Sequence, residues 1–158
     1  MARKQGYNWR GILPLLVLSL AATVVPLPGW LAPLRPDFMA LAVLWLCLVS
    51  LRTTGLFVAW SAGLAVDALS GLLLGQHALA LVIVAYIALK LRLRIRAFPI
   101  LHQTVVVLGL LWLNEFVLYW VDGVAGHPVT DWARWASVLT GAACWPLLTG
   151  LYARVALR

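Results

Sequence analysis

The sequence predicts an all-α membrane protein, a bundle of six transmembrane helices with both termini in the cytoplasm. Of its 158 residues 64% are hydrophobic and only 11% are charged, whereas about a quarter of an ordinary soluble domain is charged. A soluble fold of this length could not bury so much apolar surface, but lipid removes that requirement. Nine tryptophans agree with a membrane protein, because tryptophan favours the headgroup interface.

Six apolar stretches, separated by short polar connections, are the predicted spans. A spanning helix needs about 20 residues; the third, fifth and sixth stretches meet this length, and the fourth does if it includes Leu91 and Leu93. The first stretch follows basic residues as a signal peptide does, but it is long and lacks a small-residue cleavage pattern, so we expect a retained helix. The spans are predicted at 12–31, 37–51, 55–74, 78–91, 101–121 and 135–153, in one membrane domain.

The second stretch, 37–51, is the shortest, and the distribution of charge decides its assignment. As a helix it covers only about 21 Å. If all six stretches cross from a cytoplasmic N-terminus, ten basic residues lie inside and only Arg35 and Arg134 lie outside, as the positive-inside rule requires. If this stretch did not cross, the basic cluster 90–96 would lie outside. We therefore predict a second span that is tilted or extended back toward Leu31.

The positions of the basic, cysteine and histidine residues exclude several classes of function. The net charge of +7 does not indicate nucleic-acid binding, because the basic residues lie between apolar stretches, where they hold loops in the cytoplasm. Cys47 and Cys144 lie inside apolar stretches, and His77, His102 and His127 are scattered, so neither a disulfide nor a metal site is predicted. No nucleophile–base motif or phosphate-binding loop is present. The sequence therefore predicts no catalytic residues and no cofactor.

Two acidic residues fall inside predicted spans, Asp67 in the third and Glu115 in the fifth. A charged group at the centre of a spanning helix costs about 3 kcal/mol. Both spans run outward, so both acids are expected in the periplasmic half, where they could face one polar spot. One interpretation is a proton or cation relay, or a ligand site; the other is packing, with each acid protonated or paired. Because no arginine or lysine lies deep within a span, we favour packing.

Small residues recur at intervals of four along the third span and predict a ridge on one side of the helix. Small residues let two helix backbones approach closely, and Gly71 and Gly75 form a GxxxG pair. The ridge therefore predicts a contact with a helix of the same chain or of another protein. Its members are Gly55, Ala59, Gly63, Asp67, Gly71 and Gly75.

The motif Arg35-Pro36-Asp37 opens the second span. Pro36 suits the first turn of a helix, and Asp37 favours the positive N-terminal end of its dipole. Arg35 lies on the outer side, where a basic residue is unexpected. We interpret it either as a headgroup anchor or as a counter-charge for Asp37, Asp67 or a partner.

The basic run of Lys90, Arg92, Arg94 and Arg96 alternates with apolar residues at period two. As a helix it would spread its charges over two opposite faces, so we predict a short interfacial segment instead. Contact with anionic phospholipid would contribute about 1 kcal/mol per basic residue. Docking of a cytoplasmic protein is the alternative.

The string GLAVDALSGLLLGQHALA, from Gly63 to Ala80, resembles the signature of the MreD family of rod shape-determining inner-membrane proteins. The resemblance covers essentially the whole chain. Three further motifs agree with it: Arg35-Pro36-Asp37 at the second span, Ala97-Phe98-Pro99 with Gln103 after the basic run, and the closing Trp145-Pro146.

The resemblance implies a non-enzymatic scaffold of the bacterial cell-elongation machinery, which binds MreC and helps to position or regulate peptidoglycan synthesis. The class B penicillin-binding protein, RodA and MreB would be indirect or weaker partners, and the chain would be a multi-pass protein of the inner membrane. The implied fold resembles the substrate-binding component of energy-coupling-factor transporters. The alternative function is therefore a small-solute-binding subunit of a transporter, since fold alone cannot choose between them.

Two hypotheses about the site follow from these residues and the resemblance. In the first, the small-residue ridge or the region of Asp67 receives a helix of MreC. In the second, Asp67 and Glu115 form the remnant of a ligand pocket together with Arg35.

Overall fold

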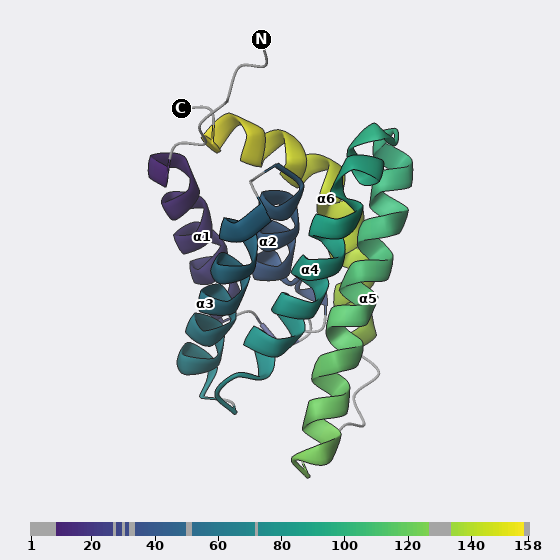
Figure 1. Ribbon diagram of the computed structural model, residues 1–158. Coiled ribbons are helices and arrows are strands. Elements are labelled where there is room, and N and C mark those ends of the chain that lie inside the picture. The colour runs from purple at the N-terminus through teal and green to yellow at the C-terminus, as the bar shows by residue number, and fades with distance from the viewer. Residues whose placement is uncertain are drawn as a thin grey trace.

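The computed structural model describes residues 9–26, 28–29, 31, 34–49, 52–71, 73–126 and 134–156. These residues form six α-helices and no strands, which confirms the predicted all-helical fold for this part of the chain. The helices are α1 (Trp9–Val24), α2 (Phe38–Val49), α3 (Arg52–Ser70), α4 (Gln76–Ala97), α5 (Ile100–Val124) and α6 (Arg134–Ala156) (Figure 1).

α2 lies at the centre of the bundle, where it contacts each of the five other helices (Figure 1). Every side chain from Met39 to Leu48 is buried. The helix begins where the carboxylate of Asp37 accepts a hydrogen bond from the N–H of Ala40 at 2.9 Å, an N-cap. It is only 12 residues long, or about 18 Å. The predicted extension toward Leu31 is therefore wrong: a helix enclosed by other helices does not have to match the thickness of a bilayer.

The small residues of α3 pack against α4, and this pair makes the most extensive helix–helix contact of the bundle. A Cβ added at Gly63 would collide with the backbone of Ala78 and lie 2.7 Å from the carbonyl carbon of His77. One added at Gly55 would lie 3.3 Å from the side chain of Leu89. The first part of the predicted ridge is therefore a contact within the chain, and α4 already covers it.

The ridge does not continue to Gly71 and Gly75, because α3 ends at Ser70. Both glycines lie in the turn between α3 and α4, with φ values of 65° and 102°. Residues other than glycine rarely adopt these φ values. Nothing lies within 4 Å of a Cβ built at either position. The GxxxG interpretation is wrong: these glycines serve the backbone of a turn and not the close approach of two helices.

α4 is longer than predicted and includes the basic run. Its helix continues to Ala97, with Ile95 buried in the core while Arg94 and Arg96 are exposed. Burial of Ile95 holds the last turns of the helix against the bundle. The predicted separate interfacial segment is therefore wrong, because α4 continues through it and Leu91 also packs against the core.

The ends of the helices divide the charged residues between the two ends of the bundle (Figure 1). The start of α1 and the ends of α4 and α6 lie at one end, which places the basic run there together with Arg154. The starts of α2 and α6 lie toward the other end, and Arg35 and Arg134 are located there. α6 bends over the bundle, and Pro146 inside it explains the bend, because proline cannot donate the hydrogen bond of a helix interior.

One described helix, α5, is by itself long and apolar enough to cross a membrane. Shorter apolar helical stretches lie at Ile12–Val24, Phe38–Val49 and Gly55–Ser70. Large apolar side chains are exposed on the outside of the bundle, among them Leu101 and Val105 of α5. Lipid would cover such side chains, and the six spans stay a prediction.

Candidate functional site

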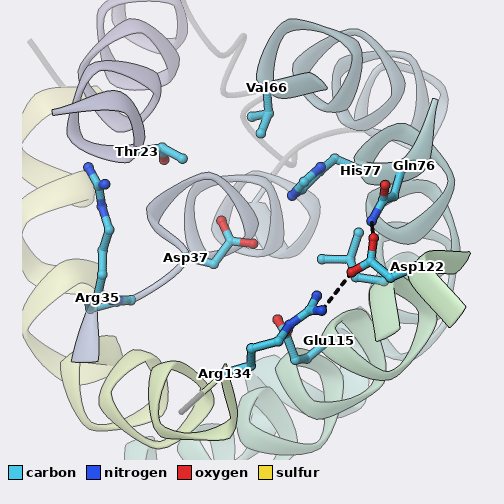
Figure 2. A pocket seen from close by; sticks show the side chains of 11 residues that line it. Thr23, Arg35, Asp37, Val66, Gln76, His77, Glu115, Asp122 and Arg134 are labelled. Atoms are coloured by element: carbon cyan, nitrogen blue, oxygen red, sulfur yellow. Dashed lines mark hydrogen bonds and ion pairs between the residues drawn. The ribbon is translucent and has the colours of Figure 1, made fainter. Parts of the chain in front are cut away.

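A cavity of about 360 Å³ lies among the helix ends at the end of the bundle opposite to the basic run (Figure 2). All six helices, or the segments that directly flank them, contribute to its wall. Charged and titratable side chains dominate this wall. They are Arg35, Asp37, His77, Glu115, Asp122 and Arg134.

Arg134 joins two carboxylates of α5. Its Nε donates to Oε1 of Glu115 at 2.7 Å, and its Nη1 donates to Oδ2 of Asp122 at 2.6 Å. Gln76 of α4 donates from Nε2 to the other oxygen of Asp122, at 2.6 Å. Burial alone would lower the pKa of Arg134, but these hydrogen bonds and charges raise the pKa above its usual value. Because Arg134 begins α6, a permanent cation ties α6 to α5, and through Gln76 to α4.

Asp67 is fully buried and organises the turn between α3 and α4. Its Oδ2 accepts the N–H of Gly75 at 2.8 Å, and its Oδ1 accepts the N–H of His77 at 3.1 Å. The same Oδ1 lies 2.7 Å from Nδ1 of His77. We infer from this bond that Nδ1 carries the hydrogen, which leaves Nε2 for the cavity. The His77 ring points from α4 toward the middle of the cavity (Figure 2).

Arg35 and Asp37 are sequence neighbours, but their side chains take different partners. The second oxygen of Asp37 accepts from Nδ2 of Asn114 at 3.3 Å. Arg35 donates from Nη2 to the carbonyl oxygen of Ala22 in the last turn of α1, where carbonyl groups lack an intrahelical donor. Within the described residues, Arg35 forms an ion pair with neither Asp37 nor Asp67. The structure therefore does not show Arg35 as the counter-charge of these two acids.

The structure brings together part of the predicted site. Arg35, Asp37 and Glu115 line the cavity, and Asp67 lies one hydrogen bond behind it, through His77. Asp67 and Glu115 are each paired inside the chain. The remaining candidates lie elsewhere: Gly63 in the contact of α3 with α4, Gly71 and Gly75 in the turn, and Lys90, Arg92, Arg94 and Arg96 on the last turns of α4.

Sequence reasoning missed Gln76, His77 and Asp122 as members of the site, and it treated Arg134 as a marker of topology only. A signal was present for one of them. Asp122 follows Glu115 by seven residues, which places both acids on one side of a helix. His77 and Gln76 lie at the start of α4, so their approach to the cavity depends on the fold of the preceding turn.

The described residues of this cavity do not form an activated nucleophile with His77 or a metal-binding group. No hydroxyl or thiol group among them is hydrogen-bonded to the His77 ring. No group of three or more His, Cys, Asp or Glu residues in these ranges could hold a metal ion. The wall carries charges of both signs within a small volume.

The fold and the cavity define an all-helical protein with apolar side chains outside and a polar cavity among its helix ends, as in membrane-associated proteins. A family model described as rod shape-determining protein MreD matches residues 4–155. The chain therefore belongs to the MreD family, whose role is in determining rod shape. No solved structure matches the chain, so the expected likeness to an energy-coupling-factor component is not shown.

Proposed function

We propose that this chain is a non-enzymatic, multi-pass scaffold of the bacterial inner membrane that binds MreC and so helps to position or regulate peptidoglycan synthesis. The family match over residues 4–155 carries this proposal. The apolar side chains on the outside of the bundle and the basic residues gathered at one end support a position across the membrane. The class B penicillin-binding protein, RodA and MreB are then indirect or weaker partners.

The surface that meets MreC cannot be the small-residue ridge of α3, because α4 covers it. We place the contact on an aromatic surface of α5 and α6, defined by Trp112, Phe116, Tyr119 and Trp135. Trp112 stacks on Phe116 with ring centroids 5.7 Å apart and lies 5.6 Å from Trp135. Tyr119 lies 6.4 Å from Trp135. Four rings thus form one continuous cluster.

Exposure and stacking distinguish the aromatic surface from an ordinary lipid-facing side. Trp112 is 52% exposed and Phe116 46%, so the pair is open to the outside although it is well ordered by stacking. Aromatic side chains dominate the energetics of protein contacts. An exposed and mutually stacked aromatic cluster therefore suits a partner helix.

At the other end of the bundle, Lys90, Arg94 and Arg96 are exposed on the last turns of α4. We place anionic phospholipid against them, because these cations lie where the cytoplasmic leaflet would be in the predicted topology. Each would contribute about 1 kcal/mol of attraction.

Co-purification with tagged MreC from membranes tests both the function and the surface. We expect the wild-type chain to co-purify and the double variant Trp112→Ala/Phe116→Ala to lose most of the complex. The matched control is Leu101→Ala/Val105→Ala, two exposed apolar residues of the same helix, which should retain it. A wild-type chain that does not co-purify would overturn the proposed function. An unchanged complex with the aromatic double variant would overturn only the surface.

A further inference from the structure

The wall of the cavity is divided by charge. Arg35 stands on one side, whereas Glu115 and Asp122 stand on the opposite side with Arg134 (Figure 2). Asp37 lies between these two sides (Figure 2). A molecule in the cavity would therefore meet a guanidinium at one end and carboxylates at the other.

Among the described residues, two carboxylates of this wall, Asp37 and Glu115, have no cation of their own. Within the described part of the chain, Asp37 accepts hydrogen bonds from a backbone N–H and from a side-chain amide, both of which are neutral. Glu115 shares its cation, Arg134, with Asp122. Half-buried carboxylates such as Asp37 and Glu115 lose part of their hydration and are costly without a paired cation, so this part of the wall is complementary to a positively charged group.

Two buried polar atoms of the wall, Nε of Arg35 and Oε1 of Gln76, have no hydrogen-bond partner among the described residues. The side chain of Gln76 is only 4% exposed, and its amide nitrogen is already bound to Asp122. Nearly all buried polar groups in native proteins are hydrogen-bonded. The free donor of Arg35 matches an anionic oxygen, and the free acceptor of Gln76 matches an N–H group.

We propose that the cavity binds a small zwitterion that carries a primary ammonium group and an anionic oxygen group. The three N–H donors of an ammonium suit the acceptors of Asp37, Glu115 and Gln76, and the anionic group suits Arg35. The volume of about 360 Å³ lies in the range of small-molecule sites. This inference does not depend on the partner proposed above, because it concerns the chain alone.

Two sources share this chemistry. One is a soluble molecule such as O-phosphoethanolamine or β-alanine, and the other is the headgroup of phosphatidylethanolamine. A metal ion fits less well, because the described residues contain no group of three His, Cys, Asp or Glu placed to hold one.

Calorimetric titration of the purified full chain in detergent tests the proposal. We expect saturable binding of O-phosphoethanolamine or β-alanine, while ethanolamine and inorganic phosphate, which each carry charge of only one sign, bind at least about tenfold more weakly. Arg35→Gln and Asp37→Asn should each weaken binding roughly tenfold or more. Asparagine can still cap α2, so Asp37→Asn is expected to fold. Arg154→Gln, which removes an exposed cation of α6, is the matched control and should bind as the wild type does.

Nanodiscs distinguish the two sources. If the source is the lipid, phosphatidylethanolamine is retained by the wild type but not by Arg35→Gln, and soluble zwitterions bind in phosphatidylglycerol discs but not in phosphatidylethanolamine discs. If the source is soluble, binding is equal in both. The proposal is overturned if neither zwitterion binds and no phosphatidylethanolamine is retained. Binding that Arg35→Gln and Asp37→Asn leave unchanged overturns it as well, provided that both variants show the thermal unfolding of a folded chain.

Discussion

Nδ1 of His77 lies 2.7 Å from Oδ1 of Asp67, a fully buried carboxylate that also accepts the backbone N–H of the same histidine. Asp67 of α3 thus fixes both the main chain and the ring of His77, which lies in the first turn of α4 beside the cavity. The third donor, the N–H of Gly75, belongs to the turn between the two helices. The conformation of the turn and the orientation of the ring are therefore set by the same group.

Replacing Asp67 should loosen the turn and the histidine together. Asp67→Asn retains one acceptor oxygen where the wild type has two, so at least one of three donors loses its partner. We expect the free energy of unfolding to fall by about 1–3 kcal/mol. Thermal unfolding in detergent measures this, with Arg154→Gln as a control on an exposed residue. An unchanged unfolding temperature would show that the Asp67 hydrogen bonds contribute little.

The contact between α3 and α4 should tolerate no side chain at Gly63. A Cβ there overlaps the backbone of Ala78, which cannot move without shifting the start of α4. We expect Gly63→Ala to destabilise the chain by about 1–3 kcal/mol. Gly109→Ala is the matched control: it lies in α5 with nothing within 4 Å of its Cβ, and alanine should stabilise a helix there by up to about 1 kcal/mol. Equal unfolding temperatures for the two variants would contradict the close contact.

The ion pair of Arg134 with Glu115 should be energetically coupled. Arg134→Gln leaves two carboxylates of α5 without their cation, and we expect a loss of about 1–3 kcal/mol, reduced by the partial exposure of the pair. Glu115→Gln alone should cost less, because the arginine keeps Asp122. Combining both substitutions in a double-mutant cycle measures the coupling. Additive effects would mean that the 2.7 Å contact contributes no coupling energy.

The predicted topology places the end of α4 in the cytoplasm. A reporter that is active only in the cytoplasm should therefore be active when it is fused after Arg96. A reporter that is active only in the periplasm should be active when it is fused after Gly126. The structure agrees, because the end of α4 and the end of α5 lie at opposite ends of the bundle (Figure 1). A periplasmic signal after Arg96 would overturn the six-span arrangement.

The sequence alone determined the features that depend on neighbouring residues. Hydropathy located all six helices, although it misplaced several ends, because apolar stretches are properties of the local chain. Asp37 was predicted at the start of a helix and caps α2. Gly63 was expected to make a close helix contact and does so. The turn at Gly71 and Gly75 was missed, because the interval of four continued past the last residue of the helix.

Only the tertiary structure decided which helix faces meet. α2 is short because five helices surround it, α4 and not a partner fills the ridge of α3, and Arg134 reaches 19 residues back to Glu115. The cavity likewise combines a guanidinium before α2, an imidazole on α4 and carboxylates on α5. Such groupings arise from packing between residues far apart in the chain, and no local period or composition encodes them.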